Sequence, residues 1–119
     1  MTIIQAINRL DALKPNTYST RQKVLWLSQL EAMVKRQVMG IREEEVQTFP
    51  EDADTDTLLL MPLPFDAAYL YWLEAQIHYA NEDMDLYNRA IVQFNGIYAE
   101  FKAAYKRSHR ARAVGRFRF

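Results

Sequence analysis

Cysteine is absent from the 119-residue sequence. This absence excludes disulfide-stabilised scaffolds, thiolate metal sites and cysteine nucleophiles. Glycine and proline are scarce, with three and four residues respectively, so the chain has little material for tight turns. Such a composition favours a few long helices. Half of the residues are apolar and 13% are aromatic, which is enough to form the core of one domain.

The sequence also lacks a long apolar run. The longest strongly apolar stretch, residues 58–61, is far shorter than the roughly 20 residues that a membrane-spanning helix needs. The first five residues lack the basic and apolar pattern of a secretory signal. We therefore expect a soluble, cytosolic protein without a membrane partner.

The formal net charge is zero, but the charges fall into three blocks. Residues 1–42 carry a net charge of +5, residues 43–101 carry −12, and residues 102–119 carry +7. Opposite charges at separate places allow one copy of a protein to attract the next. Exposed charges that meet only water would give the same counts, so charge alone leaves both interpretations open.

The first half of the chain predicts two helices. Thr2 can cap a helix over about residues 3–13, where apolar residues recur at helical spacing. A second helix opens at Ser19, which has a glutamine three positions later in the arrangement of a capping box. It is expected to run to about Met39, because a glycine follows.

The second half predicts two further helices. Asp66 is expected to cap a helix over about residues 67–80, and Asp83 one over about residues 84–107. The last helix has the clearest periodicity in the chain, with inward positions Tyr87, Ile91, Phe94, Tyr98, Phe101 and Tyr105. The prediction is an all-α bundle of about four helices in one domain, residues 1–108. The second, third and fourth helices should form its core, with the first packed across them.

Between the second and third helices the helical periodicity disappears. We expect a long, acidic and mobile loop there, because loops of this length are seldom packed. Its acids, which we predict to be an assembly surface, are Glu43, Glu44, Glu45, Asp52, Asp54 and Asp56. The apolar segment that follows, residues 58–63, should be an extended anchor into the core.

The residues that could support catalysis or metal binding form no complete site. The aspartates of the loop resemble the start of a calcium loop, but Thr57 and Leu63 occupy the positions that need glycine and glutamate. The only histidines are His78 and His109. His78 has a glutamate four positions away on each side, whereas a catalytic zinc site generally needs three protein ligands. Nucleotide-binding glycine motifs are absent. We expect no enzymatic activity, no metal and no cofactor.

The C-terminal residues 109–119 lack an amphipathic face, and we predict an extended basic tail. Its candidate partner-binding residues are Arg110, Arg112, Arg116, Phe117, Arg118 and Phe119. Arginine with phenylalanine suits phosphate neutralisation and base stacking on nucleic acid. It equally suits docking on an acidic protein, with phenylalanine as the anchor. A solvated terminus without a partner is the third possibility.

The order of these features resembles a family of small phage proteins. The segments that carry the resemblance are LKPNTYS (13–19), DTDTLLLMPLPFD (54–66), YLYWLEAQI (69–77) and DLYNRAIVQFN (85–95). Over about residues 3–108 the chain is similar to head-tail connector proteins, also called adaptor or head-completion proteins, of tailed bacteriophages and prophages.

The resemblance implies a structural virion protein without a reaction or a cofactor. Such proteins are mostly helical, and they assemble as a homo-oligomeric ring between the portal protein and tail-side connector proteins. The expected location is the neck of the virion, after assembly in the cytoplasm of the host bacterium. DNA would pass through the ring without specific recognition. The alternative, from the residues alone, is a small nucleic-acid-binding regulatory protein that uses its basic C-terminal tail.

Overall fold

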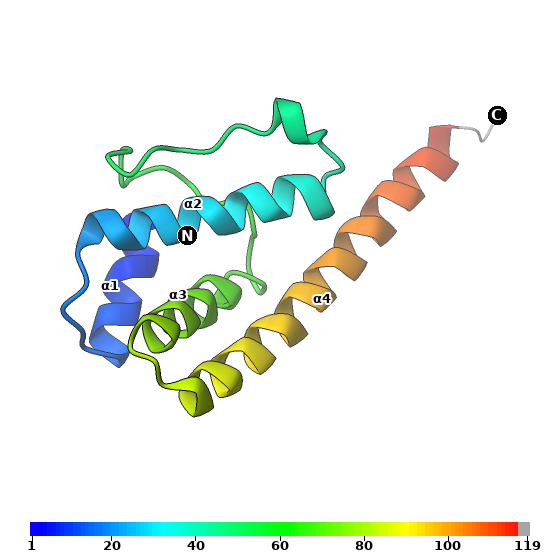
Figure 1. Ribbon diagram of the computed structural model, residues 1–119. Coiled ribbons are helices and arrows are strands. Elements are labelled where there is room, and N and C mark those ends of the chain that lie inside the picture. Colours follow the sequence, from blue (N-terminus) through cyan, green and yellow to red (C-terminus); the bar gives the residue numbers. More distant parts are fainter. Residues whose placement is uncertain (117–119) are drawn as a thin grey trace.

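The computed structural model describes the backbone of residues 1–116 and the side chains of residues 1–110. It contains four α-helices, α1 (Ile3–Leu13), α2 (Thr20–Gln37), α3 (Ala67–Ala80) and α4 (Met84–Arg116), and a short 3₁₀ helix, η1 (Glu43–Glu45) (Figure 1). Within residues 1–116 the only β-type pairing is an isolated bridge between Thr2 and Leu58. The predicted all-α bundle is therefore confirmed.

The predicted helix starts are correct, although their caps differ. The Thr2 side chain accepts a hydrogen bond from the Gln5 N–H at 3.2 Å, and the Gln5 side chain accepts one from the Thr2 N–H at 2.9 Å, which completes a capping box. Ser19 accepts only the single bond from the Gln22 N–H. Asp66 precedes α3 but makes no capping hydrogen bond with its side chain.

Helix α3 is the centre of the bundle, because it packs against α1, α2 and α4. Its buried residues lie on more than one face, and they are Ala68, Tyr69, Leu73, Ala75 and Ile77. The expectation that α1 lies outside the core is wrong. Ile3, Ile7 and Leu10 of α1 are at most 2% exposed, since the apolar stripe of this short helix faces α3.

The predicted boundary between helix and tail is also wrong. Helix α4 does not end near residue 107 but continues to Arg116, so residues 108–116 are helical and not extended. The physical reason is local, because this segment is rich in alanine and arginine, which favour helix, and it contains no proline. Basic residues near a helix C-terminus are also favoured by the helix dipole. Residues 117–119 lie outside the described part of the chain.

The acidic loop packs on its own domain, although loops of this length were expected to be seldom packed. The Ile3 N–H donates to the Thr57 carbonyl at 3.0 Å, and the Ile4 N–H donates to the Thr55 carbonyl at 2.9 Å. The Ser28 hydroxyl of α2 donates to the Phe49 carbonyl at 2.8 Å. These bonds follow from the free N–H groups that every helix start offers and from the partly buried Phe49.

The extended anchor is present as predicted. Leu59 and Met61 are buried, whereas Leu58 and Pro62 are exposed and Leu60 is only partly buried. This alternation is that of an extended chain with one face in the core. The segment thereby connects the loop to the start of α3.

The molecule is elongated, with extents of 58, 30 and 25 Å. Helix α4 is the cause, because its 33 residues form a rod about 50 Å long. Its last turns extend past the other three helices (Figure 1).

Candidate functional site

The predicted acidic surface lies on the loop that covers α2. All six of its acidic residues are exposed, and three of them form η1. Glu43 lies 3.3 Å from Arg36, and Glu44 lies 3.8 Å from Arg42. The carboxylate of Asp54 accepts a hydrogen bond from the Asp56 N–H at 2.9 Å. Part of this acidic charge is therefore matched by bases within the chain.

The predicted basic surface lies on the C-terminal part of α4, which we call the basic arm (residues 102–116). Of its four described basic residues, Lys102 is partly buried, whereas Lys106, Arg107 and Arg110 are exposed. No ion pair joins these four to any other of residues 1–110. Arg112 and Arg116 belong to the helix, but their side chains lie outside the described residues. Phe117, Arg118 and Phe119 lie outside the described residues altogether.

The arm has two aromatic contacts that lie within α4 itself. The Lys102 ammonium lies 5.0 Å from the centre of the Tyr98 ring, and the His109 ring stacks on Tyr105 with centroids 3.8 Å apart. Tyr105 packs against the core, and beyond it residues 106–110 are exposed. The arm is therefore an extension of a rigid helix that leaves the body after Tyr105.

Within residues 1–110, the two predicted surfaces do not meet, because no ion pair joins the acidic loop to the described part of the basic arm. The loop runs along α2, whereas the arm extends away from the body (Figure 1). Any contact between surfaces of these two charges would therefore join two molecules.

A second acidic surface, which the sequence analysis did not single out, lies where α3 turns into α4. We call it the acidic corner (Glu82, Asp83 and Asp85). Tyr79 and Met84, beside it in the chain, are 61% and 47% exposed. The sequence analysis had assigned Asp83 only the role of a helix cap, which its bond from the Leu86 N–H at 3.2 Å supports. The sequence carried no signal for this surface, because the exposure of Tyr79 and Met84 depends on how α3 and α4 pack.

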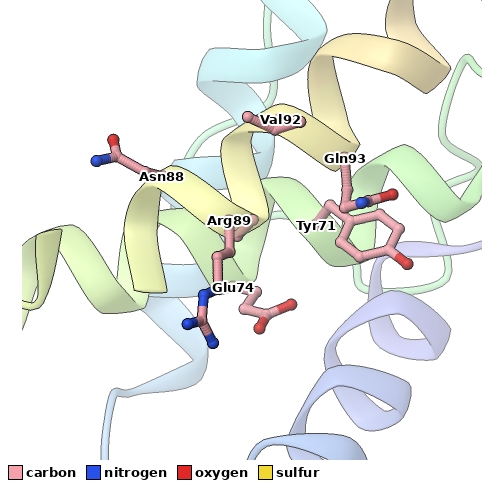
Figure 2. Close-up of a pocket in the computed structure, with 7 residues that line it drawn as sticks. Tyr71, Glu74, Asn88, Arg89, Val92 and Gln93 are labelled. Carbon is pink, nitrogen blue, oxygen red and sulfur yellow. The ribbon is translucent and has the colours of Figure 1, made fainter. Parts of the chain in front are cut away.

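A shallow groove runs between α3 and α4 (Figure 2). Its lining includes Tyr71 and Glu74 from α3 and Arg89 and Val92 from α4. Figure 2 shows Glu74 and Arg89 extending toward the same side of the groove. Glu74 is already 3.3 Å from His78 and 3.6 Å from Lys14, so its carboxylate is engaged. The groove thus presents an apolar surface with charged edges.

The most perturbed ionisable groups are inside the core. Burial raises the pKa of Glu31, although hydrogen bonds from the Tyr69 hydroxyl at 2.5 Å and the Leu60 N–H at 2.8 Å act in the opposite direction. Burial and the nearby Glu31 carboxylate raise the pKa of Tyr69 far above its usual value. The Tyr69 hydroxyl also accepts a bond from the Met61 N–H at 2.8 Å. These residues fix the extended segment, so we assign the pair a structural role.

Within the described residues, no three or more histidine or acidic side chains are grouped where they could hold a metal ion. None of the helices in residues 1–116 has both the length and the apolar character of a bilayer-spanning segment.

No protein-family model, curated protein or solved structure matches this chain.

Proposed function

We propose that the protein is a structural assembly subunit, a head-tail connector or adaptor that forms a ring between a portal protein and the tail of a bacteriophage or prophage. The observation that carries the proposal is the basic arm, which α4 extends outside the folded body. Positive charge held away from its own domain is available to another molecule. The resemblance over residues 3–108 supplies the class of assembly.

The shape of the subunit favours head-to-tail contacts. An elongated unit with a basic end and separate acidic surfaces offers different faces to its two neighbours. Contacts between different faces generate rings when the rotation closes. The neck of the virion, with portal and tail-side connector proteins as neighbours, is the proposed location.

The proposal is tested by the oligomeric state of the full chain. Sedimentation velocity over a concentration series should show cooperative formation of one closed species, and negative-stain electron microscopy should show rings. Addition of isolated portal rings should promote this assembly. A chain that stays monomeric at all concentrations, both alone and with portal rings, would contradict the proposal.

A truncation after Ser108 separates folding from assembly. The core residues of α4 end at Tyr105, so the shortened chain keeps every described core contact. Its far-UV circular dichroism should fall only by the signal of the removed helical residues, and its assembly should be weaker. Equal assembly of the two chains at the same concentration would remove the residues after Ser108 from the proposed function.

The second candidate is nucleic-acid binding, and the helical form of the arm favours it. A basic helix that leaves the body has the dimensions to enter the major groove of DNA. Fluorescence anisotropy with labelled DNA distinguishes the candidates. A binder with about six phosphate contacts should lose orders of magnitude in affinity between about 50 and 200 mM salt, whereas a connector should show little affinity at either concentration.

A further inference from the structure

Building on the proposed assembly, we infer that the basic arm of one copy docks on the acidic corner of the next copy. The corner contributes Glu82 and Asp85, and the arm contributes Arg107 and Arg110. Tyr79, at the end of α3, supplies an exposed apolar contact beside the acids.

Both ends of α4 carry unmatched charge. Among residues 1–110, no base lies within ion-pair distance of Glu82, Asp83 or Asp85. Among the same residues, no acid lies within ion-pair distance of Lys106, Arg107 or Arg110. Opposite charges that remain unpaired in one chain are complementary between two chains.

A single chain cannot bring these charges together. Asp83 and Arg107 are separated along the helix axis by about 36 Å, at about 1.5 Å per residue. This separation is several times the roughly 8–10 Å over which salt screens charges under physiological conditions. Because α4 is one uninterrupted helix, the two ends stay apart, and only another molecule can neutralise them.

The helix dipole explains only part of this charge distribution. It favours Asp85 in the first turn of α4 and basic residues in the last turn. Its effect falls off within one turn, and Lys106 and Arg107 lie more than two turns before the end at Arg116. These bases gain little from the dipole of their own helix, which leaves them free for an intermolecular role.

The corner fits this role better than the loop does. Glu43 and Glu44 of the loop already face Arg36 and Arg42, and the loop backbone is bonded to α1 and α2. The corner joins unpaired acids to an exposed aromatic side chain. Interfaces are enriched in such aromatic anchors, whereas a purely solvated acidic surface needs none.

The contact is tested by charge reversal in the full chain. One variant reverses the corner (Glu82→Lys/Asp85→Lys), and another reverses the arm (Arg107→Glu/Arg110→Glu). Asp83 stays unchanged because it caps α4. A control variant, Glu51→Lys/Glu100→Lys, makes the same change of charge at two exposed acids that belong neither to the corner nor to the six predicted loop acids. Circular dichroism and thermal unfolding establish that each variant is folded.

Each reversed variant should associate at least about tenfold more weakly than the unchanged chain, because like charges then face each other. The control should associate as the unchanged chain does. A chain that carries both reversals, and an equimolar mixture of the two variants, should regain association, since each then has complementary surfaces.

The outcomes separate this inference from the proposed function. Unchanged association of the reversed variants, or equal weakening by the control variant, would overturn the corner-to-arm contact and leave assembly itself intact. Failure of the doubly reversed chain to recover would overturn it as well. An unchanged chain that never associates, alone or with portal rings, would overturn both the contact and the proposed function.

Discussion

Tyr69 donates a 2.5 Å hydrogen bond to Glu31, 38 positions earlier in the chain, inside the core. The same hydroxyl accepts the Met61 N–H, and the other Glu31 oxygen accepts the Leu60 N–H. One tyrosine on α3 and one glutamate on α2 therefore satisfy the backbone of the segment that crosses between them. Among residues 1–110, no buried side-chain nitrogen or oxygen is left without a partner. Every buried polar side-chain atom of these residues therefore has a hydrogen-bond partner, and single substitutions can test each bond.

Replacement of Tyr69 by phenylalanine should lower the free energy of unfolding by about 2 kcal/mol or more, because it leaves a buried N–H and a carboxylate oxygen unsatisfied. Urea unfolding followed by circular dichroism measures the change. Tyr71→Phe is the matched control on the same helix, since its ring is partly buried and its hydroxyl bonds to no described residue. Similar effects of the two substitutions would contradict the role given to Tyr69.

The contribution of Glu31 to the free energy of unfolding should fall as the pH rises. Burial raises the pKa of Glu31 in the folded state above the ordinary value of 4.5, so the folded chain holds this proton more tightly than the unfolded chain. Its contribution is then complete below that ordinary value, and it is lost as the pH rises through the folded pKa. The stability advantage of the unchanged chain over Glu31→Gln should therefore shrink from acid to neutral pH. Urea unfolding of both chains at several pH values measures it, and a difference that is constant or grows with pH would contradict the prediction.

The buried ammonium of Lys23 is neutralised by the carboxylate of Asp11. The ammonium is 2.7 Å from that carboxylate, and the lysine is only 3% exposed. Asp11→Ala should destabilise the fold by about 1–3 kcal/mol, because it leaves a buried charge without its partner. Adding Lys23→Met should recover most of this loss, since the charge is then gone and the stem is retained. Thermal unfolding of the single and double variants checks the prediction, and additive losses would refute it.

Glu82 occupies a position that suits glycine. It has φ of 60° where α3 ends in a Schellman motif, with the Asp83 N–H bonded to the His78 carbonyl and the Glu82 N–H to the Tyr79 carbonyl. Glu82→Gly should therefore raise the free energy of unfolding by about 0.5–1 kcal/mol, because glycine adopts this conformation without strain. The control Glu100→Gly, in the exposed interior of α4, should lower it by about 1 kcal/mol. Urea unfolding measures the free energy of unfolding of both variants. A lower value for Glu82→Gly than for the unchanged chain would contradict backbone strain at Glu82.

Local sequence signals predicted the helix starts and the buried face of α4, because each depends on residues that are close together in the chain. Thr2 and Ser19 mark helix starts because their hydroxyls accept backbone N–H groups nearby in sequence. The aromatic stripe of α4 predicted its buried face, with Phe94, Tyr98 and Phe101 all inside. The end of α4 was mispredicted because the lack of an amphipathic face says nothing against a helix that leaves the body.

The candidate site could be predicted only in part. Blocks of acidic and basic residues are visible in the sequence, so the loop acids and the basic C-terminal residues could be named as candidates, although the helical form of the basic segment could not. The acidic corner was not, because the exposure of Tyr79 and the absence of bases around Glu82 depend on how α3 and α4 pack. Charge can be counted along a chain, whereas pairing requires distances between residues far apart in it.

The sequence by itself therefore determined the helical class, the positions of the helix starts and the segregation of charge, since each depends on residues within a turn or two of one another. Only the tertiary structure decided that α3 is the centre and that Glu31 meets Tyr69. Those properties arise from contacts between segments far apart in the chain, and no local pattern encodes them.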